Sequence, residues 1–107
     1  MDTTTDSPAR TPAAAIHSVS PLVIDVRSLR EFETLALDGA LHLPLSDLER
    51  GIGTVAPDRA TPLVLYCASG GRSGMGCMLL RQLGYTQVSN AGGLYAAAAT
   101  LQRKLIP

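Results

Sequence analysis

Short apolar runs alternate with amphipathic stretches along most of the chain. Leu63–Tyr66 is a run of four apolar residues between Pro62 and a glycine cluster, and Pro21–Val26 is also mainly apolar. Runs that are apolar on both faces are typical of buried strands in a parallel sheet. Because helical patterns lie between them, we predict an α/β fold with a small parallel sheet covered by helices on both faces.

Polar residues mark where the predicted helices begin and end. Ser28–Glu31 and Ser46–Glu49 both have the Ser-x-x-Glu pattern of a capping box, so a short helix is expected after each serine. Gly51 or Gly53 is expected to end the second helix. The other predicted elements are a short strand at Leu41–Pro44, a helix from Ser73 to Leu83 that ends before Gly84, a strand at Gln87–Ser89, a tight turn at Asn90–Gly93 and a closing helical segment within Leu94–Ile106.

Length and composition indicate one folded domain. A chain of 107 residues with 46% hydrophobic residues is enough for a single core and too small for two. Residues 1–15 are rich in Thr, Asp, Ser, Pro and Ala, with little apolar periodicity. We therefore predict a flexible N-terminal arm at residues 1–15 and one domain at residues 16–107.

The charge pattern restricts the expected partners and location. Nine basic and nine acidic residues cancel, and the basic residues form no cluster, so neither nucleic acid nor an anionic membrane is an expected partner. No apolar run approaches the roughly 20 residues that span a bilayer, and the N-terminus lacks the pattern of a signal peptide. Two cysteines are too few for a disulfide scaffold. A cytoplasmic, reducing location is the expectation.

The segment that follows Leu63–Tyr66 carries the clearest chemical signal. Cys67 stands where the strand ends, a glycine-rich loop follows, and Ser73 is the expected N-cap of the next helix. The glycines within 70–74 permit positive φ, so backbone N–H groups and the positive end of the helix dipole can converge on one anion. The Cys67 thiolate is such an anion. We predict that its pKa lies below the free value of about 8.5, with Arg72 adding positive charge, and that Cys67 is a nucleophile.

Loop length distinguishes between two kinds of cysteine chemistry. From Cys67 to Arg72 the loop has six residues, counted inclusively, one fewer than the Cys-x5-Arg loop that holds phosphate in cysteine phosphatases. A smaller ring suits a smaller anion, such as the terminal sulfur of a persulfide. The predicted site consists of catalytic Cys67 and the substrate-binding residues Ala68, Ser69, Gly70, Gly71, Arg72 and Ser73.

The order of motifs resembles the rhodanese family, whose active loop has a form close to Cys-x-x-Gly-x-Arg-Ser. The matching residues here are Cys67, Gly70, Arg72 and Ser73. The segments that resemble the family's first and last strands are Leu22–Arg27 with Glu31-Phe32 and Gly39-Ala40, and Asn90–Leu94. The resemblance covers roughly residues 20 to 105.

This resemblance implies a sulfurtransferase that works through a persulfide on Cys67. The donor would be a small molecule such as thiosulfate. The acceptor would be cyanide in an assay, or a thiol such as glutathione, thioredoxin or a protein cysteine in a cell. No metal or other cofactor is expected, because the acidic residues and histidines lack ligand spacing and no nucleotide-binding glycine pattern occurs.

Two segments depart from the family pattern. Leu35–Asp38 replaces the usual Gly-His-Ile-Pro, and Ala97 stands where related proteins often have tryptophan. We expect the local packing to differ at both places while the cysteine loop is unaffected.

Four other residues could carry chemistry, but a structural role is expected for each. Asp25 and Arg27 at the end of the first strand are expected to form an ion pair or to anchor loops. His42 is expected to face solvent or to form a local hydrogen bond. Cys77 is expected to fill core volume, although it could instead resolve a Cys67 persulfide into a disulfide.

Two other functions are compatible with the sequence. One is an interaction module with the same fold and no catalysis, which the intact cysteine loop disfavours. The other is a cysteine phosphatase or arsenate reductase, which the short loop disfavours because it offers fewer amides to a tetrahedral oxyanion.

Overall fold

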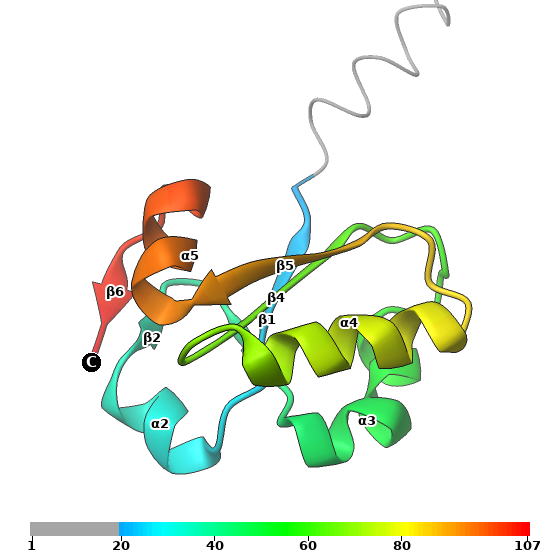
Figure 1. Ribbon diagram of the computed structural model, residues 1–107, viewed down its shortest axis with the longest axis horizontal. Helices are drawn as coiled ribbons and strands as arrows, with labels where there is room; N and C mark the ends of the chain where they lie inside the picture. Colours follow the sequence, from blue (N-terminus) through cyan, green and yellow to red (C-terminus); the bar gives the residue numbers. More distant parts are fainter. Residues whose placement is uncertain (1–19) are drawn as a thin grey trace, which may run out of the picture.

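The structure is a computed structural model that describes residues 20–107. A four-stranded parallel sheet forms the centre of the fold (Figure 1). The strand order is β3-β1-β4-β5. The strands are β1 (Leu22–Asp25), β3 (Leu41–His42), β4 (Leu63–Cys67) and β5 (Val88–Gly93). Every residue of β4 is buried, and this strand pairs with β1 on one side and β5 on the other. The predicted arm, residues 1–15, lies outside the described residues.

Helices cover both faces of the sheet, as predicted. On one face α3 (Leu48–Val55) and α4 (Gly71–Gln82) bury Ile52 and Leu80 against Leu65 of the sheet (Figure 1). On the other face α5 (Leu94–Leu101) buries Leu94 and Ala97 near Val23 and Tyr66. A short helix, α2 (Leu29–Thr34), follows β1, and a 3-10 turn, η1 (Leu45–Asp47), precedes α3.

A second, two-stranded sheet includes part of the segment Leu35–Asp38, where the sequence departs from the family pattern. Strand β2 (Ala36–Leu37) pairs antiparallel with β6 (Leu105–Ile106). The predicted closing helix therefore ends at Leu101, and the chain turns back through Gln102, whose φ is +54°. The apolar pair of β2 contributes Leu37 to the core, which gives this segment a packing role.

The two predicted capping boxes have different outcomes. At Ser28–Glu31 both reciprocal hydrogen bonds are present, which confirms the first. The prediction at Ser46–Glu49 is wrong, because that segment forms η1 and α3 begins without a side-chain cap at Asp47. Gly51 and Gly53 do not end α3 either. Burial of its apolar face compensates for the roughly 1 kcal/mol by which each glycine disfavours a helix.

Strand β5 is longer than predicted. Asn90–Gly93, the expected tight turn, continues the strand that begins at Val88. The β4–β5 pairing contains an irregularity: Leu65 is opposite Asn90, whereas Cys67 is opposite Gly93. Two steps along β4 thus match three along β5. This extra residue brings the end of β5 beside the loop that follows Cys67.

Candidate active site

Cys67 ends the central strand and points its sulfur into the loop that follows. The residue is 1% exposed. Gly70, with φ +101°, reverses the chain, and α4 begins at Gly71. The prediction that Ser73 is the N-cap is therefore wrong: Gly70 is the cap, and Ser73 lies in the first turn. The left-handed conformation at Gly70 explains the shift, because it lets the helix start directly after the loop.

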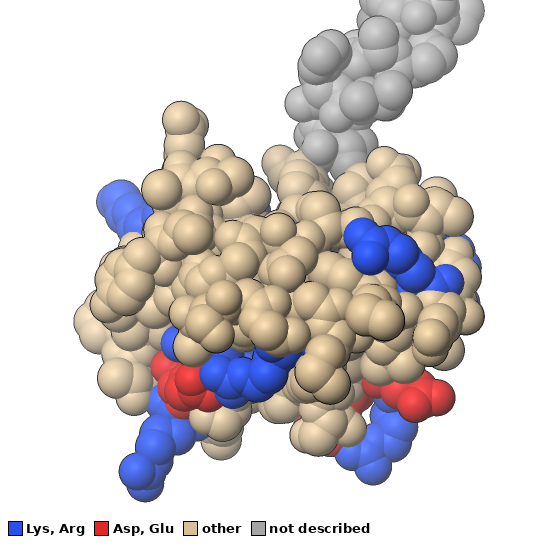
Figure 2. All heavy atoms as spheres, in the orientation of Figure 1, with Lys and Arg blue, Asp and Glu red and all other residues tan. Residues whose placement is uncertain are grey.

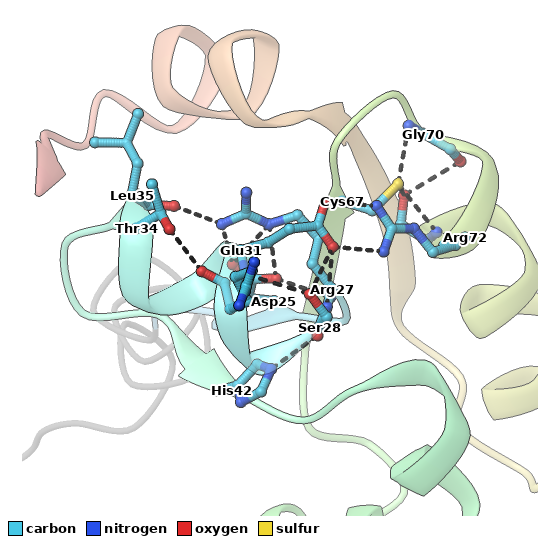
Figure 3. Close-up of polar contacts among 12 residues, drawn as sticks. Asp25, Arg27, Ser28, Glu31, Thr34, Leu35, His42, Cys67, Gly70 and Arg72 are labelled. Carbon is cyan, nitrogen blue, oxygen red and sulfur yellow. Dashed lines mark hydrogen bonds and ion pairs between the residues drawn. The ribbon is translucent and has the colours of Figure 1, made fainter. Parts of the chain in front are cut away.

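Three donors converge on the Cys67 sulfur, one from Gly70, which is labelled in Figure 3, and two from Ser73. The backbone N–H of Gly70 lies 2.9 Å from Sγ, and that of Ser73 lies 3.4 Å away. The Ser73 hydroxyl is 3.3 Å from the same atom. The loop and the first turn of α4 thus form the nest of N–H groups that the glycine spacing predicts.

These donors change the acidity of Cys67. Burial raises the pKa of the thiol, but the hydrogen bonds outweigh this effect and lower the pKa to about 7. The Ser73 hydroxyl contributes most to this lowering, followed by the backbone N–H groups of Ser73, Ser69 and Gly70. A thiolate is therefore accessible near neutral pH, which agrees with the predicted direction.

Asn90 of β5 forms hydrogen bonds with the loop that surrounds the Cys67 sulfur. Its Nδ2 donates to the Gly70 carbonyl at 3.1 Å, and its Oδ1 accepts the Gly92 N–H at 2.9 Å. The Ser73 hydroxyl lies 2.7 Å from the same Oδ1. The Gly70 carbonyl oxygen is a third acceptor, 3.2 Å from the hydroxyl. Because a hydroxyl has one proton, Ser73 donates to only one of these three acceptors at a time. Asn90 was predicted only as part of a turn.

The glycines at the end of β5 fit tightly against the loop. A Cβ added at Gly93 would lie 2.5 Å from the Ala68 carbonyl oxygen, and one added at Gly70 would lie 3.4 Å from the Gly92 Cα. Only glycine allows the approach at position 93, whereas at position 70 the left-handed φ of +101° is what favours glycine. A Cβ at Gly71 would meet nothing within 4 Å, so Gly71 faces open space.

Arg72 is held by a partner that the sequence did not predict. Its Nη1 and Nη2 donate to Oε1 and Oε2 of Glu31 at 2.8 and 2.9 Å (Figure 3). The hydrogen bond from Arg72, which outweighs the opposing effect of burial, lowers the pKa of Glu31 to about 2, and Glu31 in turn raises the pKa of Arg72. The capping box accounts for Glu31 within its own helix, so nothing in the sequence pointed to this second contact.

The remaining chemical candidates have structural contacts. Arg27 and Asp25 form the predicted ion pair at 2.7 Å, both buried, and Arg27 also donates to the Leu35 carbonyl. His42 Nε2 lies 2.8 Å from the Arg27 carbonyl, so it has the predicted local hydrogen bond. Cys77 belongs to α4 and is buried in the core, and burial raises the pKa of its thiol, which supports the predicted filling role.

Within residues 20–107, no group of three or more His, Cys, Asp or Glu side chains is placed to hold a metal ion. No helix in the same range is long and apolar enough to cross a membrane. On the face shown in Figure 2, charged side chains are dispersed, and acidic ones lie next to basic ones at its lower edge. The charges on that face therefore form no large field of one sign.

Comparison with known proteins gives the family. The model of the family described as "Rhodanese-like domain" matches residues 10–100. The thiosulfate sulfurtransferase PspE of Escherichia coli is 38% identical over 71 residues, which span 66% of this chain and 68% of that protein. A thiosulfate:glutathione sulfurtransferase of Saccharomyces cerevisiae is 27% identical over 84 residues, 68% of this chain and 60% of that one.

A solved structure described as a rhodanese with anions from E. coli superimposes with a TM-score of 0.75 at 32% identity, covering 81% of this chain and 98% of that one. The chain thus belongs to the rhodanese-like domain family, as its motifs indicated. Its relatives support sulfur transfer as the general activity.

Proposed function

We propose that this protein transfers a sulfane sulfur from a small donor such as thiosulfate to a thiol, through a persulfide on Cys67. The observation that carries the proposal is the convergence of three donors on one buried sulfur, which lowers the pKa of the Cys67 thiol to about 7. A thiolate available at neutral pH is the nucleophile that this chemistry needs.

In the first half-reaction the Cys67 thiolate attacks the outer sulfur of thiosulfate. A new S–S bond forms at Cys67, the S–S bond of thiosulfate breaks, and sulfite leaves with its electron pair. The negative charge then resides on the terminal sulfur of the persulfide. In the second half-reaction an acceptor thiolate attacks that sulfur, and Cys67 is released as a thiolate. Charge and electrons balance in each step without another reactant.

The loop suits these two half-reactions because the negative charge moves from the Cys67 sulfur to the terminal sulfur of the persulfide and does not disappear. The N–H groups of Ser69 and Gly70 and the first turn of α4 surround the place where the charge develops. Donors fixed in advance at such a place stabilise the transition state and the intermediate without reorganisation. Ala68 and Gly71 are proposed to contribute only their backbone to this loop.

Arg72 is proposed to bind the oxyanion end of the donor. Its pairing with Glu31 uses two N–H bonds of a guanidinium that has five. The remaining N–H bonds can contact sulfonate oxygens while the backbone holds the transferring sulfur. The alternative, an Arg72 that only clamps α4 to α2, predicts that donor binding is insensitive to its replacement.

For the acceptor we propose a thiol such as glutathione, thioredoxin or a protein cysteine. The name of the yeast relative includes glutathione, which supports a small thiol as one acceptor of this family. A reducing, cytoplasmic setting suits the two free cysteines, because a thiolate must stay unoxidised to act.

The decisive measurement is the intact mass of the protein after incubation with thiosulfate and removal of the excess. A gain of one sulfur atom is expected in the wild type and in Cys77→Ser, and none in Cys67→Ser. Cyanide should remove the added mass. Since serine nearly keeps the volume of cysteine, Cys67→Ser should melt at a similar temperature, which separates lost chemistry from lost folding.

Three results would contradict the proposal. A wild-type protein that gains no sulfur, with no release of sulfite, would support the interaction module. A protein that gains no sulfur but hydrolyses aryl phosphates would support the phosphatase. If Cys77→Ser were the variant without mass gain, the assignment of the nucleophile would be wrong.

A further inference from the structure

The carboxylate of Glu31 is fixed on two sides. Its Oε1 accepts the Ser28 N–H at 3.1 Å and the Ser28 hydroxyl at 3.0 Å, which completes the capping box of α2. The same Oε1 accepts Nη1 of Arg72 at 2.8 Å, and Oε2 accepts Nη2. The hydrogen bonds from Ser28 therefore hold the Glu31 carboxylate in position independently of its contact with Arg72.

This contact places an anion where a substrate anion would bind. Arg72 is the sixth residue of the loop that surrounds the Cys67 sulfur. A carboxylate that pairs with both terminal nitrogens of a guanidinium has the bidentate geometry that a sulfonate or phosphate also adopts. Glu31 occupies that edge of Arg72 and largely neutralises its charge (Figure 3).

We propose that Glu31 is a specificity-determining residue: it competes with anionic ligands for Arg72 and so weakens the binding of dianionic oxyanions more than that of monoanions. The proposal deepens the proposed function, since it concerns which donors enter the same loop. A dianion has to share Arg72 with the carboxylate and is also repelled by it. A monoanion experiences about half of that repulsion.

The competition is moderate because solvent reaches both partners. The side chains of Arg72 and Glu31 are 40% and 34% exposed. Ion pairs at such positions change an equilibrium by about two- to five-fold. We therefore expect removal of the Glu31 charge to tighten the binding of a dianion by about this factor.

Glu31→Gln is the informative variant, because glutamine at this position can still complete a capping box. The matched control is Glu33→Gln, which removes the same charge from an exposed position of the same helix. Residues two apart on a helix point in different directions, so the control leaves the Arg72 contact in place. Arg72→Ala is the second reference, in which the proposed anion contact is absent.

Anion binding can be measured without turnover. Sulfate, a dianion, and methanesulfonate, a monoanion, are titrated as protectants of Cys67 against iodoacetamide in the full chain. Glu31→Gln should bind sulfate about two- to five-fold more tightly than the wild type does, with a smaller gain for methanesulfonate. Glu33→Gln should match the wild type within about 1.5-fold. Thermal melting confirms that each variant is folded.

Three results would overturn the proposal. Sulfate could bind equally well to Glu31→Gln and the wild type, or it could fail to protect Cys67 in the variant. Weaker binding in Glu31→Gln, similar to that of Arg72→Ala, would mean that Glu31 positions Arg72 for the anion and does not compete with it. Because alkylation needs no sulfur transfer, these results are distinct from a failure of the mass experiment.

Discussion

Replacement of Ser73 by alanine tests how the loop makes Cys67 acidic. The substitution removes the hydroxyl that lies 3.3 Å from the sulfur and keeps the backbone N–H at 3.4 Å. The side chain is fully buried at the start of α4, where alanine fits a helix well. The change therefore isolates one of the three donors.

The expected shift follows from the strength of a single bond. A hydrogen bond to a charged group contributes about 1.5–3 kcal/mol. The lower end applies here, because the bond is long and Asn90 competes for the same proton. About 1.4 kcal/mol corresponds to one pKa unit, so the pKa of Cys67 should rise from about 7 to about 8.

The assay is the rate of alkylation of Cys67 by iodoacetamide between pH 5.5 and 9.5, in a Cys77→Ser background that leaves one thiol. At pH 7 the thiolate fraction should fall from about a half to about a tenth. Each remaining thiolate is about three-fold more nucleophilic, because nucleophilicity rises with pKa. The variant should therefore react about two-fold more slowly at pH 7 and about 2.5-fold faster near pH 9.

This crossing of the two profiles is the diagnostic result. Damage to the fold is recognised separately by thermal melting, because unfolding would expose the buried Cys67 to the reagent. An unchanged midpoint would refute the reasoning. It would mean that the Ser73 hydroxyl donates to Asn90 or Gly70 in both protonation states and contributes nothing to the thiolate.

One further substitution and one insertion test the shape of the loop. Gly93→Ala should lower the free energy of unfolding by about 1–3 kcal/mol, because its Cβ would lie 2.5 Å from the Ala68 carbonyl oxygen. Gly53→Ala is the control: its Cβ meets nothing, and it should raise the stability by roughly 1 kcal/mol because Gly53 lies within α3. A denaturant midpoint of Gly93→Ala equal to that of the wild type would contradict the prediction. A glycine inserted between Gly70 and Gly71 should slow thiosulfate sulfur transfer by a factor of about 100 or more and strengthen inhibition by arsenate, because each N–H moves away from a lone sulfur. Unchanged transfer would show that loop length does not select sulfur.

The sequence predicts the parts of the site whose physics is local. The loop from Cys67 to Ser73 is contiguous, and its glycines, the strand before it and the helix after it all act within a few residues. For the same reason the capping box at Ser28–Glu31 and the Asp25–Arg27 pair are confirmed by the structure. The N-cap was misplaced because a left-handed glycine can replace a serine cap, and both occur in the same loop.

The contacts that the sequence did not reveal are tertiary. Glu31 and Arg72 are 41 positions apart, and the Asn90–Ser73 contact depends on an extra residue in β5. The strands β2 and β6 have two residues each, too short to show an alternating pattern. Folding brings these segments together through packing, for which a single sequence contains no periodic signal.

Backbone amides before and after Cys67 have different hydrogen-bond acceptors, because Cys67 ends strand β4 and the loop begins after it. The amides of β4 are paired within the sheet, where exchange with solvent deuterium requires the domain to unfold. The Gly70 amide instead donates to a sulfur atom, so its protection varies with what that atom carries. Deuterium uptake at this single amide, compared with uptake along β4, therefore reports whether the sulfur is a thiol, a thiolate or a persulfide.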